Sequence, residues 1–318
     1  MTSTWKPAAS IAVLELRAQM LRAAREYFAA TRALEVETPT LSAAGVSDVH
    51  LASVEARAIG RPRYLHTSPE YAMKRLLAAG CGDIWQITKV YRDGESGRWH
   101  NPEFTMIEWY RVGIDHHALI ADVERLVSAM LPPERQFDRA ERLSYREAVQ
   151  LHTGIDPFED PTPVLIARLE SAGIEVPAAI HGERDACLDL IMSTLVGPAL
   201  GHGRLTFIYD YPASQAALAK VRGAVASRFE AYLDGIELAN GFHELADAAE
   251  QRARFDRDLA ERSRRGLPLH PVDEHFLQAL EHGLPECSGV ALGFDRLVMC
   301  AAGAKHIDEV LAFPFDRA

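Results

Sequence analysis

The pattern of apolar and polar positions begins with a helical period. Between residues 8 and 31, apolar side chains recur every three or four positions among Arg, Gln and Glu, which predicts an amphipathic helix with Ser10 as its N-cap. The next apolar stretch, residues 34–39, is short and ends at Pro39. Because proline cannot donate to a β-ladder, we expect this strand at a protected sheet edge or at a dimer interface.

Two stretches rich in β-branched and aromatic residues, 83–92 and 104–111, enclose a polar loop with Gly94, Gly97 and Pro102. The simplest interpretation is an antiparallel hairpin with a long connection. A hairpin that only extends a sheet needs two loop residues, whereas this loop carries arginine, histidine, asparagine and acids. Such side chains suit an anionic, nitrogen-rich ligand. A solvated surface loop is the alternative.

The pattern changes from strand to helix near residues 64–77. Ser68 is a capping residue, Pro69 occupies the first helical position and Glu70 falls in the first turn. A carboxylate at this place either complements the helix dipole or is held rigidly towards a pocket. The pattern leaves both interpretations open.

The remaining segments predict an α+β fold, in which helices flank an antiparallel sheet. We expect one domain over residues 1–318, with a helical insertion at roughly 140–203. An Asn-Gly pair at 240–241 indicates a turn. Further helices are expected at 118–130, 145–152, 163–172, 184–200, 244–265 and 273–282, and further strands at 204–212, 229–239 and 309–315, with a strand that runs into a helix at 288–300.

Composition limits the class of protein. The chain has 318 residues, of which 48% are hydrophobic and 25% are charged, enough for one large core or two modest ones. The apolar runs end before the ~20 residues that a membrane span requires, and the first residues lack the apolar segment of a signal peptide. The four cysteines are far apart and form no metal-type pair. We therefore expect a cytoplasmic protein with reduced thiols.

The charge balance is acidic, with 34 Lys and Arg against 45 Asp and Glu and a formal net charge of −11. Proteins whose main partner is a long nucleic acid usually carry a basic surface, because contacts to phosphates dominate that affinity. The charge therefore argues against tRNA or DNA as the main partner. It suits a basic protein surface or a cationic small substrate.

Two carboxylates, Glu237 and Glu244, lie on either side of the expected Asn240-Gly241 turn. Acids so placed are natural oxygen ligands for Mg²⁺, which takes one or two carboxylates beside substrate phosphates. Taken alone, Glu237 could be a solvated strand residue, and Glu244 could simply begin the next helix.

A third place for chemistry is residues 289–296. Gly289 and Gly293 would let a ligand approach the backbone closely, and Arg296 arrives at a helix start, where an anion is favoured. The alternative is close packing between strand and helix, with Arg296 paired to Asp295 or a neighbour. The chain contains no P-loop pattern. Together with the hairpin arginines, these residues fit a nucleotide bound with magnesium.

These motifs resemble those of the class II lysyl-tRNA synthetase catalytic domain, and more closely those of the elongation factor P–lysine ligase family, short paralogues without an anticodon-binding domain. Residues 34–41, Leu-Glu-Val-Glu-Thr-Pro-Thr-Leu, look like motif 1, which lies at the dimer interface in that family. The hairpin looks like motif 2, and residues 289–296 look like motif 3. The runs at 100–110 and 235–245 are specific to the lysine branch.

The resemblance implies a homodimer with a site for ATP, Mg²⁺ and (R)-β-lysine or lysine. Arg92 and Arg296 would be the catalytic residues that hold phosphates, and Glu237 and Glu244 would bind the metal. The implied ATP contacts are Arg92, Asp93, Gly94, His100, Asn101, Phe104 (stacked on adenine), Glu237, Leu238, Gly293 and Arg296. The implied substrate contacts are Ser68, Pro69, Glu70, Glu108, Tyr110, Glu244 and Ala291.

The sequence departs from the family pattern at two positions. Gly94 stands where the synthetases carry a glutamate that approaches the adenine amino group, and Glu95 is the candidate to replace it. Ala291 stands where lysyl-tRNA synthetases carry glycine. A methyl group there would hinder an α-amino group and favour a β-amino acid.

The implied activity is ATP-dependent adenylation of (R)-β-lysine or lysine, followed by transfer to the ε-amino group of a lysine on elongation factor P. One rival is a truncated lysyl-tRNA synthetase that charges tRNA, but the early helix leaves no room for an N-terminal barrel, and the acidic charge opposes tRNA binding. An amide ligase like asparagine synthetase would not need Glu70 and Glu108 together. The third rival is a non-catalytic paralogue that only binds an amino acid or a partner.

Overall fold

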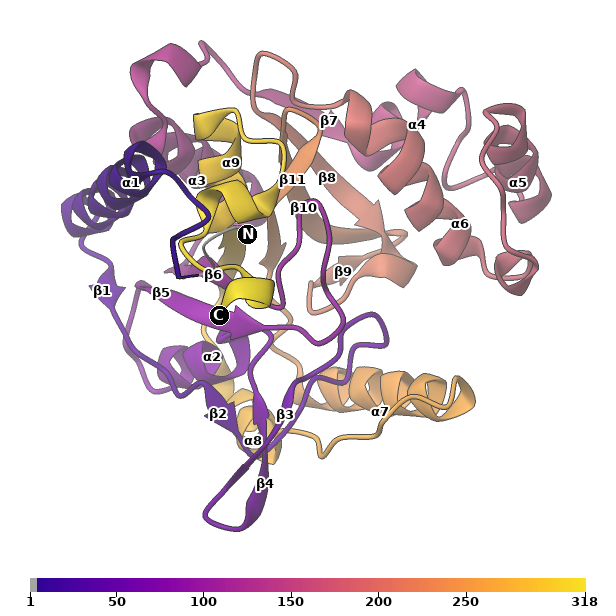
Figure 1. The fold of residues 1–318 in the computed structure, drawn as a ribbon. Coiled ribbons are helices and arrows are strands. Elements are labelled where there is room, and N and C mark those ends of the chain that lie inside the picture. Colours follow the sequence, from indigo (N-terminus) through magenta and orange to yellow (C-terminus); the bar gives the residue numbers. More distant parts are fainter. Residues whose placement is uncertain (1–4) are drawn as a thin grey trace.

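A central sheet organises the fold in the computed structural model, which describes residues 5–318 (Figure 1). Its strand order is β1-β5-β6-β12-β11-β10-β8-β7, with β9 beside β10. The inner pairs are antiparallel, as predicted, whereas β1–β5 and β7–β8 at the two ends are parallel. The strands are β1 Leu34–Glu35, β5 Ile84–Tyr91, β6 Glu103–Val112, β7 Glu141–Ser144, β8 Thr206–Pro212, β9 Val221–Arg222, β10 Val225–Leu233, β11 Ile236–His243 and β12 Cys287–Gly293.

The predicted hairpin is confirmed. β5 and β6 pair without interruption from Ile84 opposite Tyr110 to Tyr91 opposite Glu103, and residues 92–102 form the long connection. The short strand β1 also lies where the proline predicted it, at the edge of the sheet beside β5.

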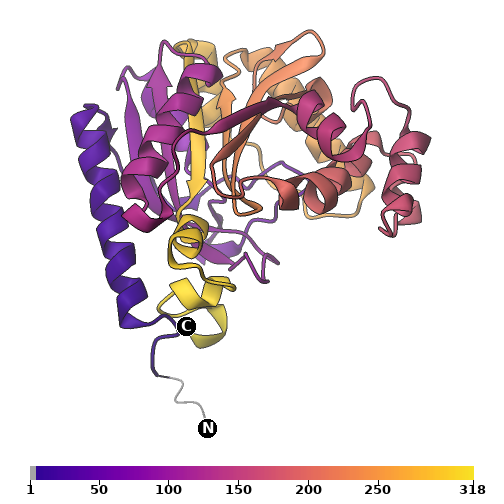
Figure 2. The same cartoon turned by 90° about the horizontal axis from the view of Figure 1, so that it is seen from above.

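Three helices, α1 (Ile11–Ala30), α3 (His116–Met130) and α9 (Phe294–Ala302), cover one face of the sheet. Side chains from this face and these helices form the largest core. In it the ring of Phe28 stacks on Trp85 at 4.3 Å between centroids and meets the edge of Trp109. Figure 2 shows α1 running along the outside of the molecule. Its Ser10 cap is present, since Ser10 accepts a hydrogen bond from the Val13 amide.

The opposite face carries α2 (Glu70–Ala78), α7 (Ala248–Arg264) and α8 (Glu274–Gly283), together with a small sheet of β2 (Leu41–Ser42), β4 (Arg61–Leu65) and β3 (Glu55–Ala58). These elements lie together at the bottom of Figure 1. Met73, Phe255 and Phe276 form their shared core with Tyr110 of β6. Of the small sheet, the sequence pattern predicted only the end of β4 near Tyr64, because the strands are short and largely exposed.

A third group of helices packs against the β8 end of the sheet, at the upper right of Figure 1. It contains α4 (Tyr145–Thr153), α5 (Thr162–Ser171) and α6 (Arg184–Ile191), and α6 continues into a π-helical turn at Met192–Val196. The ring of Tyr145 contacts Tyr211 of β8 at 4.7 Å between centroids. Short 3₁₀ helices occur at Pro133–Arg135, Ala178–Ile180, Gly197–Ala199, Ala213–Gln215, Ile307–Val310 and Phe315–Arg317.

The expected turn at Asn240-Gly241 is wrong. Both residues lie inside β11, and the chain reverses instead at Asp234-Gly235, where both residues have positive φ, 52° and 74°. The single strand expected at 229–239 is therefore two strands, β10 and β11. The expected helix start at Glu244 is also wrong, because α7 begins at Ala248 after the cap of Asp247, which accepts a hydrogen bond from Glu250.

The strand expected at 309–315 is wrong as well. His306 and Glu309 form a capping box that begins a 3₁₀ helix, and Pro314 precedes another. This terminal segment accepts a backbone hydrogen bond of 2.8 Å from Ala8 to Ala312. The expected lack of an apolar leader falls partly on residues 1–4, which lie outside the described residues. None of the helices within residues 5–318 has the length and apolarity to traverse a bilayer.

Candidate functional site

Strand β6 separates the core from the candidate site by alternation. Successive side chains of a strand point to opposite faces of the sheet. Ile107 and Trp109 therefore belong to the large core, and Glu108 and Tyr110 point to the face covered by α2, α7 and α8.

The pairing register carries this face across the sheet. Tyr110 lies opposite Gly289 and Glu108 lies opposite Ala291 on β12, and Ala291 in turn lies opposite Asn240 on β11. Asn240 lies opposite Glu230 on β10. Because directly opposed residues share a face, the register collects polar groups from four strands on one side of the sheet.

A bulge in β11 brings Glu237 onto the same face. Ala231 pairs with Ala239, but the next residue, Tyr232, pairs with Glu237, so Leu238 is the extra residue. Glu237 and Glu244 are an odd number of positions apart and would lie on opposite faces of a regular strand. The extra residue at Leu238 removes that mismatch.

The end of the site near α2 is an acidic pocket. Glu108 accepts hydrogen bonds of 2.7 Å from both Ser68 and Tyr110, and the Ser68 hydroxyl accepts one from the Glu70 amide. Glu70 and Glu244 both contact the ammonium group of Lys74 at 2.6 Å. The structure thus brings Ser68, Glu70, Glu108, Tyr110 and Glu244 together, as the sequence predicted, and adds Lys74, whose helical pattern marked it only as part of α2.

Burial decides the protonation of these acids. Burial, and next the negative charge of Glu70, raises the pKa of Glu108 to about 8. Burial also raises the pKa of Glu244 to about 7, although the positive charge of Lys74 opposes this. The carboxylates of this pocket therefore favour the binding of a positively charged group.

The other end of the site carries arginines. Arg296 donates to the carbonyls of Glu237 at 3.0 Å and Trp99 at 3.2 Å, and to Nε2 of His100 at 2.6 Å. Burial, and next the charge of Arg296, lowers the pKa of His100, which suits an imidazole that accepts this hydrogen bond. Of the expected alternative, the pair between Arg296 and Asp295 is wrong, and Arg296 contacts other neighbours instead.

Asp295 instead binds Arg17 of α1 and the amide of Thr105 at 2.7 Å. Arg17 also donates to the Thr105 hydroxyl at 2.8 Å. This network fixes the start of α9 to β6 and leaves the guanidinium of Arg296 to the loop and to the site.

The carboxylate beside Glu237 is Glu230. Burial, and next the charge of Glu230, raises the pKa of Glu237 to about 7, while Arg296 and Arg228 oppose this. Glu230 is buried and is bound by Arg228 and by the hydroxyl of Tyr232 at 2.6 Å. A carboxylate whose pKa is raised by a neighbouring carboxylate forms with it a donor set that a divalent cation would stabilise.

Glu244 does not belong to that pair. It lies seven residues beyond Glu237, roughly 20 Å along the strand at ~3.3 Å per residue, so one Mg²⁺ ion with ligands at ~2.1 Å cannot bind both. Sequence reasoning missed Glu230 because it placed the chain reversal after these residues. Among the described residues, donor atoms of His116, His117 and Asp210 also lie within 4.8 Å of one another, between α3 and β8. This group contains neither Glu237 nor Glu244.

The hairpin loop is held by its own backbone and by the end of the chain. Asn101 donates to the Glu103 carbonyl at 2.6 Å and accepts from the Phe315 amide at 3.0 Å, so both ends of its amide are engaged. The guanidinium of Arg92 lies over the Phe104 ring at 5.0 Å. Arg92 also contacts Glu95 at 3.6 Å.

Gly94 has a local reason to be glycine. Its φ is +76°, a conformation in which a side chain is strained. The departure from the family glutamate therefore matches a left-handed loop tip. The neighbouring Asp93 donates its amide to the Ala52 carbonyl and exposes its side chain.

The two glycines of β12 differ in what surrounds them. A Cβ on Gly289 would overlap with the ring of Tyr110 and lie 2.6 Å from Oε1 of Glu244, so this glycine admits protein side chains and not a ligand. Gly293 has φ −70°, and its nearest neighbours, Arg296 and the Leu238 carbonyl, would lie 3.7 Å from a Cβ. Neither backbone nor packing requires glycine at 293.

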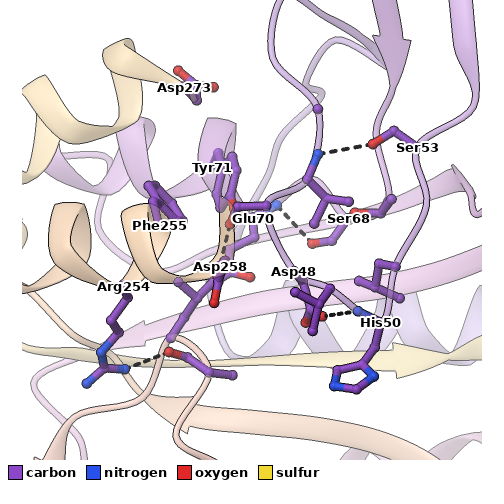
Figure 3. A pocket seen from close by; sticks show the side chains of 18 of the residues that line it. Asp48, His50, Ser53, Ser68, Glu70, Tyr71, Arg254, Phe255, Asp258 and Asp273 are labelled. Atoms are coloured by element: carbon purple, nitrogen blue, oxygen red, sulfur yellow. Dashed lines mark hydrogen bonds between the residues drawn. The ribbon is translucent and has the colours of Figure 1, made fainter. Parts of the chain in front are cut away.

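A cavity of about 1290 Å³ opens above these groups. Figure 3 shows Ser68 and Glu70 on one side of it, with Arg254, Phe255 and Asp258 of α7 nearby. Its lining includes Arg92, Arg228 and Ala291, together with Pro69 next to Glu70. Glu108, Tyr110 and Glu244 are nearly fully buried beneath this lining. The cavity therefore extends from the acidic pocket to Arg92 and Arg228.

Comparisons with known proteins agree with this arrangement. A model of the tRNA synthetases of class II (D, K and N) matches residues 4–317. An elongation factor P–(R)-β-lysine ligase of Vibrio cholerae is 50% identical over 326 aligned residues, which cover 99% of each chain. The ligases of the same name from Klebsiella pneumoniae and Salmonella arizonae are 49% and 47% identical, and each alignment covers 100% of this chain and 99% of the relative.

The contrast between the glycines gives a prediction for folding. Gly289→Ala should lower the free energy of unfolding by about 1–3 kcal/mol, because the methyl group overlaps with buried side chains. Gly293→Ala is the matched control and should leave it unchanged or raise it by up to about 1 kcal/mol. Urea denaturation measures both; equal losses in the two variants would contradict this account of β12.

Proposed function

The chain belongs to the class II tRNA synthetase family that includes the aspartate, lysine and asparagine enzymes, together with the elongation factor P–(R)-β-lysine ligases, and on this premise we propose how it acts. It activates (R)-β-lysine with ATP as an adenylate and transfers it to the ε-amino group of a lysine on elongation factor P. It is an ATP-dependent ligase that forms AMP.

One observation carries this proposal: Arg92 stands between the two ends of the site. Its Nε donates to the Thr67 carbonyl at 3.4 Å, next to Ser68 of the acidic pocket, and its guanidinium covers Phe104. An adenylate forms where a carboxylate meets the α-phosphate of ATP. A cation between an amine pocket and a phosphate site is placed to stabilise both anions.

The acidic pocket suits the amino groups of the substrate. A diamino acid carries two ammonium groups, and each buried ammonium needs a charged partner. Glu70, Glu108 and Glu244 provide such partners, and Ser68 and Tyr110 orient Glu108. The substrate carboxylate then extends towards Arg92.

The arginine end suits ATP. Arg296 would hold the distal phosphates, Phe104 would stack on the adenine next to His100 and Asn101, and the Leu238 backbone would lie near the nucleotide. Gly293 supports this assignment. No packing contact requires a glycine there, whereas a nucleotide that lies against the strand would require one. Asp93 and Gly94 would shape the loop around the base.

The reaction proceeds in two steps. An oxygen of the substrate carboxylate attacks the α-phosphorus in line, a new P–O bond forms, and the bond to the β-phosphate breaks to release pyrophosphate. The acceptor ε-amine then attacks the activated carbonyl, an amide bond forms, the amine loses a proton, and AMP leaves. Positioning and charge stabilisation account for the catalysis, so no side-chain nucleophile is required.

Mg²⁺ fits the pair Glu230 and Glu237. Both carboxylates lie on one face, Glu230 buried and Glu237 partly buried, and the pKa of Glu237 is raised, which a divalent cation would reverse. When bound there, the ion would neutralise phosphate charge. Glu244 is then free for the substrate amine.

The proposal predicts lysine-dependent ATP–pyrophosphate exchange. (R)-β-lysine or L-lysine should drive incorporation of labelled pyrophosphate into ATP, and Arg296→Ala should lower the rate about 10²–10³-fold, because it removes a charge that stabilises the transferring phosphates. Arg125→Ala, at a largely exposed arginine of α3, is the control and should keep the wild-type rate. If no lysine isomer supports exchange by the wild-type protein, the chain is a binding paralogue and not a ligase.

Ala291 is proposed to select the β-amino acid. It lies opposite Glu108 in the register and lines the cavity, where its methyl group would meet an α-amino group. Ala291→Gly should shift the ratio of kcat/KM for (R)-β-lysine over L-lysine by about tenfold towards L-lysine, the usual effect of one methyl group in a pocket. Adenylate formation measures this ratio, and an unchanged ratio would remove Ala291 from the account of specificity.

We also propose a homodimer through the β1 edge. Leu34 of β1, Ile11 of α1 and Leu41 of β2 are exposed apolar side chains, at 53%, 66% and 42% of their full accessibility. Leu34→Asp should convert the protein from dimer to monomer in sedimentation equilibrium, since a carboxylate opposes burial. Leu151→Asp on α4, where Leu151 is 68% exposed, is the matched control. A monomeric wild-type protein would refute the proposal.

A further inference from the structure

Lys74 lies beneath the acidic pocket and has no assigned part in the proposed reaction. Its side chain is fully buried. Its Nζ lies 2.6 Å from Oε1 of Glu70 and 2.6 Å from Oε2 of Glu244, and 5.7 Å from the centre of the Phe276 ring. Glu70 and Lys74 are one helical turn apart on α2, a spacing that places them on one face, and Glu244 reaches them from the end of β11.

Stability alone does not account for a buried lysine here. Its neighbours on α2 and α8, Met73, Leu77 and Phe276, are apolar, so a methionine or leucine would fit this environment. Replacement of a buried ion pair by apolar residues is often neutral or stabilising. The reason for Lys74 must then lie in the charges around it.

The charges of the pocket can be counted. Glu70, Glu108 and Glu244 bring three negative charges when ionised, and Lys74 brings one positive charge. The balance is two negative charges, which neutralise the two positive charges of the ammonium groups of a diamino acid.

We propose that Lys74 is a positioning residue that sets the charge of the substrate pocket to match a diamino acid. This inference rests on the proposed function. Lys74 holds Glu70 and Glu244 by direct contact and leaves two negative charges for the substrate. A pocket without Lys74 would retain a proton on one carboxylate and would lose one substrate contact.

The surrounding groups support a pocket that titrates as a unit. Glu70 and Lys74 face it from α2, Glu108 and Tyr110 from β6, Glu244 from the end of β11 and Cys287 from β12, and Tyr71 lies beside Glu70. Burial opposes the charge of Lys74, but Glu244 and Glu70 outweigh it and raise the pKa of the ammonium. Lys74 therefore stays charged over the pH range in which Glu108 and Glu244, with pKa values raised to about 8 and about 7, gain or lose protons.

The sign of the effect follows. At neutral pH the free pocket carries protons that an incoming diamino acid displaces, so kcat/KM for that substrate rises with pH through the pKa values of the acids. Loss of the positive charge of Lys74 raises those pKa values, whereas loss of one negative charge lowers them.

Two substitutions and their combination test this proposal. Lys74→Met should move the acidic limb of the kcat/KM profile for L-lysine or (R)-β-lysine to higher pH by about one unit, and raise the KM of the amino acid about tenfold, with the KM of ATP nearly unchanged. Glu244→Gln should move the limb to lower pH. The double variant restores two negative charges and should return the limb towards the wild-type position.

Lys89→Met on β5 is the control for loss of a lysine charge, because Lys89 is partly exposed and pairs with Glu103 outside the pocket. If Lys74→Met does not fold, the comparison of Glu244→Gln with the double variant measures the same shift. An unshifted limb, or equal loss of activity at every pH with both KM values raised, would show a merely structural lysine and overturn the inference.

The two proposals fail separately. Exchange by the wild-type protein supports the proposed function whatever the Lys74 variants do. If the wild-type protein shows no exchange, calorimetric binding of L-lysine across pH 6–9 replaces the kinetic profile, with the same expected shifts. Absence of any binding would overturn this inference together with the function.

Discussion

A β-strand presents alternate side chains to opposite faces, and the whole site depends on this constraint. β6 carries Trp109 and Ile107 into the core and Glu108 and Tyr110 into the pocket, so the residues that stabilise the fold and those proposed to bind substrate are covalent neighbours. The antiparallel register repeats this separation on β12, β11 and β10. The polar face can be rich in charge because the core face of the same strands is rich in aromatic rings.

The site also depends on how its buried charges are compensated. Burial of ionised carboxylates is unfavourable, and at each end of the site a cation from a helix compensates for it. Lys74 of α2 does so in the acidic pocket, and Arg296 of α9 does so at the arginine end. Arg17 removes Asp295 from competition for Arg296. These contacts join helices to strands far apart in the sequence, so the site requires the complete fold.

Local patterns predicted the elements whose signals are local. The long loop of the hairpin, the proline at the edge strand and the Ser10 cap are each predicted from a few adjacent residues, and all three are confirmed. The α+β fold and the family are confirmed as well. The bulge at Leu238 and the turn at Asp234-Gly235 could not be predicted, because Asn240-Gly241 is the stronger turn signal and only the pairing with β10 and β12 keeps it in a strand. Glu230 was missed because the misplaced turn put it on one strand with Glu237, and Lys74 was missed because its contact with Glu244 joins α2 to the end of β11. The roles of the individual site residues stay predictions.

The extra residue in β11 also has an evolutionary consequence. Insertions and deletions are usually harmless at the ends of strands, but with the bulge in place, removal of one residue between Asn240 and Glu244 would reverse the alternation there. Glu237 and Glu244 would then point to opposite faces of the sheet, one of them towards the core face that carries Phe229, Leu292 and Leu297. Descendants of this chain can therefore exchange side chains along β11, yet they cannot change the number of residues between the bulge and Glu244 by one and keep both ends of the site. The site constrains the length of this segment as well as the identity of its acids.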